Sequence, residues 1–408
     1  MVTELLEDFR IVSINGPRQS GKTTLAKEIA RAIDMDYYTF DNESIRSTAQ
    51  NDPITFIEQL SKKSCVIDEI QMVPEVISAL KMSVDEKNQA GMFLLTGSAD
   101  LFKMSVIRES LAGRMVSISL YPLSYFEMNA CTKNCIDMLF DRSIIDFDFM
   151  KLEYAQMVEH MITGGYPAVQ GKSARSMESW FESYIEARIE KDLSLIKKVS
   201  RGNKFEIDKL LRILASITSN LLKYSSLSKH LIIKDVTVKS DIEILEALFL
   251  VKRITPYFTN RGKREIKAPK IAFIDTGLVA HLIDANAHSL IVSDREMLGN
   301  LVENFVYSEL LKHATYANKS TKIYHYRDGS YEVDLVLEQK NGNIVAIEVK
   351  SSATLKTEYL RGLVRLAQNA GDNFKAGYIF YGGEKILPLS KDGYDFWAIP
   401  FAVLFGEK

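Results

Sequence analysis

The stretch G-P-R-Q-S-G-K-T, residues 16–23, decides the fold of the first part of the chain. It fits the pattern G-x-x-x-x-G-K-[ST] and lies between an apolar strand, residues 10–14, and a helical pattern over residues 22–33. Gly16 and Gly21 permit backbone angles that other residues resist, so the loop amides can point inward. Strand, loop and helix in this order predict a parallel α/β sheet whose first loop binds phosphate.

This loop is expected to bind ATP together with Mg²⁺. Lys22 is predicted to reach the β- and γ-phosphates, and the Thr23 hydroxyl is predicted to ligate Mg²⁺. A Gly-rich turn that matches by coincidence is the alternative, but the flanking strand and helix favour the nucleotide interpretation. The predicted nucleotide loop comprises Gly16, Pro17, Arg18, Gln19, Ser20, Gly21, Lys22, Thr23 and Thr24.

A second motif supplies the expected partner of this loop. Residues 65–67, Cys-Val-Ile, form a short apolar run of the kind found in buried strands, and Asp68 and Glu69 follow it. Asp68 is predicted to bind Mg²⁺, and Glu69 is predicted to polarise the attacking water. A solvated acidic turn is the alternative, which the upstream loop disfavours. Hydrolysis, as distinct from binding, depends on Glu69.

A third segment supplies polar residues and an arginine. The next predicted strand is followed by Thr96 and Ser98, which are of the type that senses a γ-phosphate or orients water. A helical stretch over residues 99–112 leads to Arg114 and another strand. This order resembles the AAA+ ATPase core, and the resemblance implies a homo-oligomer in which Arg114, or as second choice Arg108, reaches a neighbouring subunit's nucleotide. An arginine that merely stabilises a helix end is the alternative.

The middle of the chain predicts a winged helix. Residues 227–231 and 237–248 are typical of a helix–turn–helix, and residues 251–258 and 270–274 of a β-ribbon. Basic residues near the ribbon tip are expected to contact DNA phosphates, although winged helices also dock proteins. These tip residues are Arg261, Lys263, Arg264 and Lys267.

Two alternating strands are predicted near the C-terminus, over residues 331–339 and 344–351, with a three-residue turn, 341–343, between them. This turn places Asp334 opposite Lys350. Strand alternation also predicts that Val333 and Leu335 share one face, with Asp334 on the other. On Lys350's face lies Glu348, so the strands are expected to bring two carboxylates and one ammonium together.

Asp334, Glu348 and Lys350 form the D…E-x-K arrangement of the restriction-endonuclease-like fold. Two carboxylates hold a hard cation, which lowers the pKa of a bound water. Lys350 can stabilise developing negative charge, and Glu303, on a preceding predicted helix, is expected to extend the metal shell. An exposed hairpin with an Asp–Lys cross-strand pair is the alternative.

The motif order resembles, over nearly the full length, a large prokaryotic family of AAA-type ATP-binding proteins with a C-terminal nuclease-like domain of unknown function. The order is P-loop, D-E strand, T-G-S, L-A-G-R, P-L-S, G-G-Y-P, winged helix, K-I-A-F-I-D-T-G-L, L-V-E-N-F-V-Y-S-E-L, E-V-D-L-V-L and A-I-E-V-K-S-S. The resemblance implies ATP binding at residues 16–23 and 68–69 and a restriction-like acidic site. Lys191-Asp192 departs from the Arg-Asp pair of that family, because lysine lacks the guanidinium fork.

Length and composition fit this interpretation. The 408 residues carry a formal net charge of −2, which gives no general basic field, and the three cysteines are too few for a disulfide framework. No signal peptide or membrane-spanning run is visible, so a cytoplasmic protein is expected. The expected fold is α/β: a P-loop, AAA+-like core (1–127), an insertion and helical lid (128–204), a winged helix (205–285) and a restriction-endonuclease-like domain (290–408).

Three functions follow as hypotheses. The first is an ATP-hydrolysing protein whose nuclease-like C-terminal domain acts on or with DNA. The second is a nucleotide-switched protein-interaction module in which that domain is catalytically inactive; the near-neutral charge favours it, and the basic wing and the E-x-K motif disfavour it. The third is a single-turnover ATP sensor in a defence system.

Overall fold

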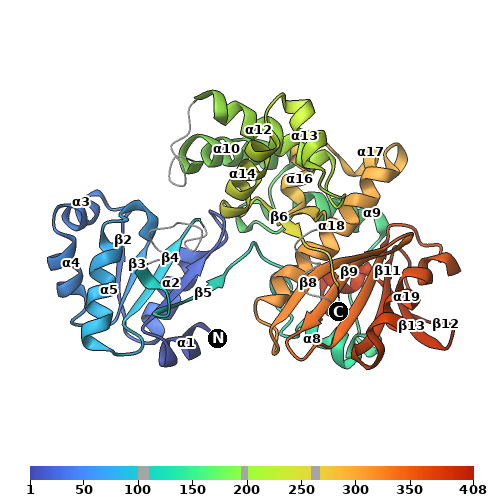
Figure 1. Ribbon diagram of the computed structural model, residues 1–408, viewed down its shortest axis with the longest axis horizontal. Coiled ribbons are helices and arrows are strands. Elements are labelled where there is room, and N and C mark those ends of the chain that lie inside the picture. The colour runs from blue at the N-terminus through green and yellow to red at the C-terminus, as the bar shows by residue number, and fades with distance from the viewer. Residues whose placement is uncertain (100–109, 194–200, 259–266) are drawn as a thin grey trace. The chain divides into compact units, whose positions relative to one another are not determined.

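The computed structural model describes residues 1–99, 110–193, 201–258 and 267–408. These residues form two compact units (Figure 1). Unit 1 comprises Met1–Pro122, Ile185–Lys204 and Glu243–Leu250, and unit 2 comprises Leu123–Tyr184, Phe205–Ile242 and Val251–Lys408. Among the described helices, none is long and apolar enough to cross a membrane.

Unit 1 is built on a five-stranded parallel sheet of order β2-β3-β4-β1-β5. Because β4 lies between β1 and β3, the loops that follow these three strands meet at one edge of the sheet. The strands are β1 (Ile11–Asn15), β2 (Asp36–Thr39), β3 (Cys65–Asp68), β4 (Phe93–Gly97) and β5 (Met115–Ser119).

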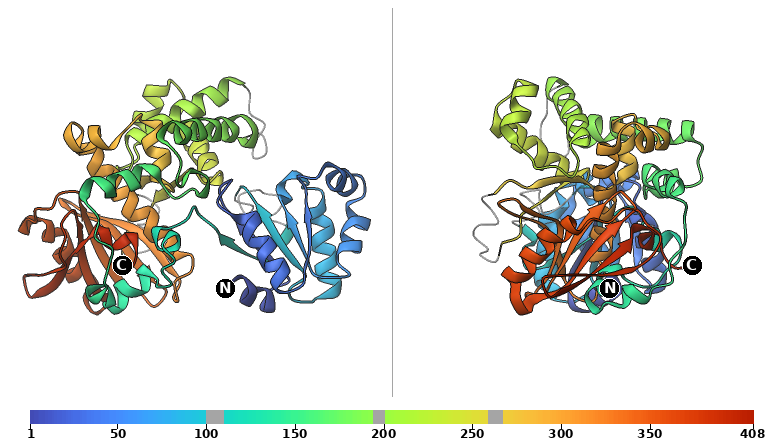
Figure 2. Two further views of the ribbon diagram at one scale, coloured as in Figure 1. Left: turned by 180° about the vertical axis from the view of Figure 1, so that it is seen from behind. Right: turned by 90° about the vertical axis from the view of Figure 1, so that its right-hand side faces the viewer.

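Helices cover both faces of this sheet, as the two views in Figure 2 show. Alternate strand residues create two cores: Val12 and Leu94 belong to one, and Ile11 and Leu95 to the other. The predicted parallel α/β sheet is therefore confirmed, as is a helix that begins at Lys22. The helices are α1 (Val2–Asp8), α2 (Lys22–Ala32), α3 (Glu43–Asn51), α4 (Pro53–Leu60) and α5 (Val76–Lys87).

Unit 2 contains a six-stranded mixed sheet of order β12-β13-β11-β10-β9-β8. Helix α19 packs on β9, β10 and β11 through an apolar core, and α18 contacts β7, β8 and β10. The elements are β8 (Thr321–Asp328), β9 (Tyr331–Gln339), β10 (Ile344–Lys350), β11 (Phe374–Tyr381), β12 (Leu387–Lys391), β13 (Tyr394–Pro400), α18 (Arg295–Ala314) and α19 (Leu360–Ala370).

The predicted turn between β9 and β10 is wrong by one residue. Gln339 N donates to Asn343 O at 3.0 Å, so the three-residue loop is 340–342. Leu335 pairs with Ile347, which makes Glu348, and not Lys350, the next residue across from Asp334. The predicted register was wrong because Asn341 and Asn343 suit the same tight turn equally well.

The predicted face of Val333 is also wrong. The β8–β9 register shifts between Tyr324, opposite Val336, and Tyr326, opposite Val333, so β9 carries one extra residue. Val333 and Val336 consequently pack in the same core. Such a bulge re-aims the intervening side chains, and Asp334 is one of them.

The remaining described helices belong wholly or partly to unit 2, and three of them, α10, α12 and α14, contain residues of both units. They are α7 (Tyr125–Met128), α8 (Cys135–Asp141), α9 (Tyr154–Thr163), α10 (Ala174–Ala187), α12 (Arg201–Ser216), α13 (Tyr224–Leu231), α14 (Asp235–Ala247), α16 (Thr276–Leu282) and α17 (Ala287–Val292).

The elements expected for a winged helix occur near their predicted positions. Helices α13 and α14 are followed by the antiparallel pair β6 (Val251–Ile254) and β7 (Lys270–Phe273), while the winged helix itself stays a prediction. In α14 the C-terminal half is largely buried. Its fully exposed residues, Asp235, Val236, Lys239 and Glu243, are of mixed charge. Arg261, Lys263, Arg264 and Arg108 lie outside the described residues.

Several quoted motifs meet in a buried polar network of unit 2. Asp275 accepts a hydrogen bond from Gly165 N at 2.7 Å, and Lys312 donates to Glu309 at 2.6 Å and to Leu123 O at 3.0 Å. Glu309 also accepts from Tyr125 N at 2.9 Å. These motifs therefore stabilise the fold, since buried charges persist only when paired and hydrogen-bonded.

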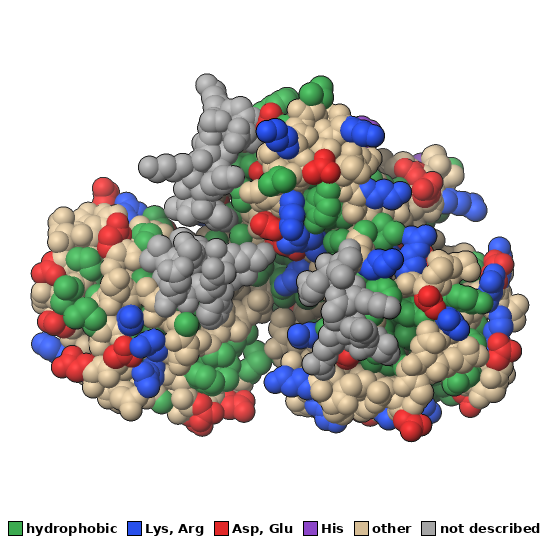
Figure 3. Space-filling view, viewed as in Figure 1, with side chains coloured by type: hydrophobic (Ala, Val, Ile, Leu, Met, Phe, Trp, Pro, Cys, Tyr) green, Lys and Arg blue, Asp and Glu red, His purple; other side chains and the backbone are tan. Residues whose placement is uncertain are grey.

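The visible surface carries no large area of a single charge. On the face drawn in Figure 3, Lys and Arg side chains lie among Asp and Glu, consistent with the formal net charge of −2. Electrostatic recognition must therefore come from local clusters of charge.

Candidate nucleotide site and acidic pocket

The loop after β1 has the geometry that its glycines predict. A Cβ on Gly16 would lie 2.0 Å from Leu120 O, so no other residue fits without displacing the backbone. Gly21 has φ +96° and directly precedes α2, whose first amides are free to bind an anion. Inside the loop, Ser20 and Lys22 both donate to Pro17 O, at 3.0 and 2.6 Å.

Lys22 is almost completely buried, with 4% of its surface exposed. Burial lowers the pKa of its ammonium to about 8, against the opposing effect of the nearby Glu69 charge. Its ammonium donates a hydrogen bond to the Pro17 carbonyl at 2.6 Å, a partner that carries no charge. Lys22 therefore has a strong electrostatic preference for an anionic ligand.

Asp68 is the centre of a hydrogen-bond cluster at the end of β3. It accepts from Thr23 Oγ1 at 3.0 Å, from Tyr37 OH at 2.6 Å and from Thr96 Oγ1. Burial and Asp68 raise the pKa of Tyr37, so the phenol stays a donor. The Thr23 hydroxyl and the Asp68 carboxylate are oxygen ligands of the kind Mg²⁺ prefers, and they fit an ion bridged to phosphate.

Glu69 is held beside this cluster by β4. Its amide donates to Thr96 Oγ1 at 3.1 Å, and its φ of +59° is uncommon for a residue with a side chain. Gln71 donates to the Glu69 carboxylate and, at 3.0 Å, to Ser98 Oγ. Thr96 and Ser98 therefore orient Glu69, directly and through Gln71.

An ion pair connects the loop to the short π-helix Arg188–Asp192, which follows α10. Arg18 Nη2 lies 2.8 Å from Asp192 Oδ1, and the other carboxylate oxygen binds Arg188. Arg188 is fully buried and also donates to Ser98 O at 3.2 Å and to Leu248 O. Asp192 therefore pairs with two arginines, Arg18 and Arg188, although the residue before it is a lysine.

Arg114 lies at the opposite edge of the sheet from the loop. It directly precedes the first paired residue of β5, whereas residues 16–23 follow the last residue of the parallel strand β1. A strand of this length spans roughly 16 Å. Arg114 forms a bidentate pair with Asp85, at 2.6 and 2.7 Å. Its position excludes contact with a nucleotide in the loop of its own chain.

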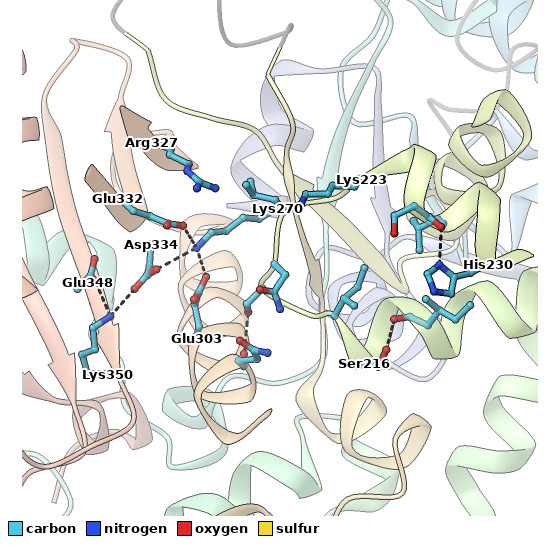
Figure 4. Close-up of a pocket in the computed structure, with 18 residues that line it drawn as sticks. Ser216, Lys223, His230, Lys270, Glu303, Arg327, Glu332, Asp334, Glu348 and Lys350 are labelled. Carbon is cyan, nitrogen blue, oxygen red and sulfur yellow. Dashed lines mark hydrogen bonds and ion pairs between the residues drawn. The ribbon is translucent and has the colours of Figure 1, made fainter. Parts of the chain in front are cut away.

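The second predicted site lies in a pocket of about 790 Å³ in unit 2. Glu303 of α18, Asp334 of β9 and Glu348 of β10 all line it (Figure 4). Lys350 Nζ lies 2.6 Å from Glu348 Oε1 and 3.8 Å from Asp334 Oδ2. The expected convergence of Asp334, Glu348 and Lys350 therefore occurs despite the different register.

The centre of this pocket contains a cation that the sequence interpretation did not include. Lys270 Nζ of β7 lies 2.8 Å from Glu303, 3.2 Å from Asp334 and 3.3 Å from Glu332. As they stand, the described His, Cys, Asp and Glu residues contain no group of three or more arranged to hold a metal ion. Lys270 instead pairs with Glu303 and Asp334, two of the three carboxylates of this pocket that were predicted to bind metal.

The carboxylates and lysines of this pocket shift one another's pKa values. Burial, followed by the charge of Asp334, raises the pKa of both Glu303 and Glu348 to about 8. Burial alone would also raise the pKa of Asp334, but Lys270 and then Lys350 bring it below its ordinary value. Asp334 is therefore the carboxylate that carries negative charge between the two lysines.

Three family models match separate parts of the chain. Residues 8–129 match an AAA domain. Residues 298–403 match a domain of unknown function (DUF4143), and residues 154–289 match another (DUF8612). The AAA and DUF4143 matches support an AAA-type ATPase family, and the AAA match supports ATP binding.

Similar proteins occur in bacteria and archaea. An uncharacterized protein of Mycobacterium tuberculosis is 27% identical over 388 residues, which cover 93% of this chain and 78% of that protein. An uncharacterized protein of Methanocaldococcus jannaschii is 23% identical over 390 residues, covering 88% and 80%. A solved Walker-type ATPase of Pyrococcus abyssi is 13% identical, with a TM-score of 0.37, and the match covers 69% of this chain and 93% of that one.

Proposed function

We propose that this protein binds ATP with Mg²⁺ and hydrolyses it. The observation that carries the proposal is the hydrogen bond of 3.0 Å between Thr23 Oγ1 and Asp68, beside the buried Lys22. Together these groups offer one carboxylate, one hydroxyl and one ammonium at the end of a phosphate-binding loop. The AAA domain match over residues 8–129 supports the same assignment.

In this proposal each residue has one task. Lys22 leaves Pro17 O and binds the β- and γ-phosphates, which restores its full positive charge. Thr23 and Asp68 hold Mg²⁺, which neutralises phosphate charge when bound. Glu69 accepts a proton from the attacking water, and Gln71 keeps its carboxylate in position.

The test separates binding from hydrolysis. Glu69→Gln removes the proton acceptor but preserves the size of the side chain, so Mg²⁺-ATP binding should persist while phosphate release is lost. Glu75→Gln, an exposed carboxylate next to α5, is the matched control and should behave as the native chain. If Glu69→Gln hydrolysed ATP at the native rate, a residue other than Glu69 would accept the proton from the attacking water.

For unit 2 we propose an action on or with DNA. Support comes from the D…E-x-K residues, which share one pocket with the basic side chains of Lys223 and Arg327. ATP turnover measured with single-stranded DNA, duplex DNA and RNA tests the link. Stimulation by DNA that falls steeply with salt would support phosphate contacts, and unchanged turnover with every ligand would refute it.

A second candidate function is favoured by Lys270. Because this ammonium satisfies the carboxylates without a metal ion, unit 2 could serve as a catalytically inactive module whose state follows the nucleotide in unit 1. DNA cleavage in the presence of Mg²⁺ or Mn²⁺ distinguishes the two candidates. Cleavage that Glu348→Ala abolishes would reject the inactive module.

The proposal also includes a homo-oligomer. Arg114 lies at the edge of the sheet away from its own loop, so it would act on the nucleotide of another subunit, after leaving its partner Asp85. ATP turnover per chain should then rise with protein concentration as subunits assemble. Turnover per chain that stays constant across dilution would refute the shared site.

A further inference from the structure

The cation at the centre of the acidic pocket belongs to the chain itself. Lys270 extends from β7 between three carboxylates, as Figure 4 shows, and only 4% of its side chain is exposed. Glu303 and Asp334 are at hydrogen-bonding distance, 2.8 and 3.2 Å, and Glu332 lies at 3.3 Å. The carboxylates come from two elements, α18 and β9, so the ammonium joins a helix to the sheet.

Three carboxylate oxygens around one point form the environment in which a small divalent cation is usually held. An ammonium at that point already lies against these oxygens, and a second cation at the same place would meet strong repulsion from it at a few ångströms. The second oxygen of Asp334 accepts a hydrogen bond from Val349 N at 2.9 Å and lies 3.8 Å from Lys350 Nζ. Groups of the chain therefore contact both oxygens of this central carboxylate.

Glu348 is the carboxylate of this pocket whose hydrogen bonding is incomplete. Its Oε1 pairs with Lys350, but its Oε2 is buried and has no hydrogen-bond partner among the residues that the structure describes. Leaving a buried carboxylate oxygen unpaired is costly. The two lysines therefore satisfy Glu303 and Asp334 better than they satisfy Glu348.

We infer that Lys270 is an intramolecular counter-ion that occupies the cation position of the acidic pocket and keeps divalent metal ions out of it. The inference rests on the proposed nuclease-like site of unit 2, whose regulation it names, and it is independent of ATP turnover. Metal binds in the pocket only when the Lys270 ammonium leaves the carboxylates.

The backbone around Lys270 is held by hydrogen bonds, so release of the ammonium would require movement of the side chain alone. Lys270 starts the β6–β7 pair, and its neighbours are held by the hydrogen bonds Leu222 N to Pro269 O, 2.7 Å, and Ile271 N to Asn220 O, 3.0 Å. The flexible lysine stem and the volume of about 790 Å³ allow the ammonium to swing aside without unfolding β7.

This inference is tested by titrating the full chain with Mn²⁺ and measuring the Mn²⁺ affinity. Calorimetry measures the heat of binding, and electron paramagnetic resonance measures the concentration of free Mn²⁺. Lys270→Met removes the ammonium and should create or strengthen a Mn²⁺ site by about tenfold or more, since a charge-assisted contact is lost to the competitor. Lys223→Met is the matched control, because Lys223 lines the same pocket and, within the described part of the chain, forms no ion pair with these carboxylates.

A second variant separates this pocket from the nucleotide loop, which can also bind metal. Adding Asp334→Asn to Lys270→Met should abolish the gained site and leave any binding at Asp68 unchanged. Lys270→Gln, which keeps a hydrogen-bond donor but no charge, replaces Lys270→Met if thermal melting shows that the methionine variant does not fold.

Two outcomes would overturn the inference. One is a native chain that binds Mn²⁺ at an Asp334-dependent site as tightly as Lys270→Met does. The other is a folded Lys270 variant that gains no such site. DNA cleavage is measured separately. A Lys270 variant that gains a Mn²⁺ site but does not cut DNA would refute the nuclease-like proposal, while the inference that Lys270 acts as a counter-ion would still hold.

Discussion

The buried ammonium of Lys22 predicts that ATP affinity falls as the pH rises above neutrality. Burial lowers its pKa from 10.5 to about 8 in the free protein. Only the protonated form attracts the triphosphate, and contact with phosphate returns the pKa toward its ordinary value. At pH 7 about nine-tenths of the free chains carry this proton, and at pH 9 about one-tenth do.

The expected magnitude follows from this population. Mg²⁺-ATP should bind about tenfold more weakly at pH 9 than at pH 7, or about 1.4 kcal/mol. Near pH 8 each binding event should take up about half a proton. The phosphate groups of ATP are already ionised above pH 7, so they add little to this slope.

Calorimetry in buffers of different ionisation enthalpy measures both affinity and proton uptake. The native chain titrated with a non-hydrolysable ATP analogue serves as the parent, because Glu69→Gln would remove a charge that raises the pKa of Lys22. Lys22→Arg is the control, because a guanidinium keeps its proton throughout this range. The assignment of the titration to Lys22 would be refuted if the parent bound the nucleotide with the same affinity at every pH. It would also be refuted if the affinity of Lys22→Arg fell with pH as steeply as that of the parent.

Three further substitutions test other parts of the fold and site. Gly16→Ala places a methyl group 2.0 Å from Leu120 O, so it should displace the loop, lower the melting temperature and weaken ATP binding; native binding would contradict the loop geometry. Arg114→Ala should barely change the melting temperature but reduce turnover by about 10³-fold or more if the arginine acts on a neighbouring subunit, and turnover by mixed Arg114→Ala and Lys22→Ala chains would support that arrangement. In Asp275→Asn the new side-chain amide faces one of the two backbone amides, Gly165 N or Leu278 N, that now donate to the carboxylate. This change should lower the free energy of unfolding of unit 2 by about 1–3 kcal/mol, measured by urea denaturation. An unchanged urea midpoint would show that the network is dispensable.

The nucleotide loop was predictable because its signal is local. Residues 16–23 encode strand, turn and helix within one continuous stretch, and the glycines are required by the backbone itself. Asp68 was predictable for a related reason, since parallel strands bring the ends of β1 and β3 to the same edge of the sheet. The AAA domain match covers this region.

The partners that lie far apart in sequence were not predictable in the same way. Lys270 is 33 residues from Glu303 and 64 from Asp334, and it lies on a strand that was interpreted only as part of a wing. Arg188 meets Ser98 across 90 residues. Neither pairing has a periodic signal, because contacts of this kind depend on how separate elements pack.

The acidic strands show an intermediate case. Alternation predicted β9 and β10, but the bulge that separates Val333 from Val336 leaves no trace in residue type. Asp334 and Lys350 nevertheless approach to 3.8 Å, since long side chains reach across more than one register position. The set of residues was therefore predicted more reliably than their alignment.

Phosphate release from Mg²⁺-ATP by the purified full chain, compared with that of Lys22→Ala, tests the central claim most directly. The account predicts steady turnover by the native chain and its loss in the variant, with the melting temperature of both unchanged or nearly so. Equal turnover by the two chains would contradict a nucleotide site at residues 16–23.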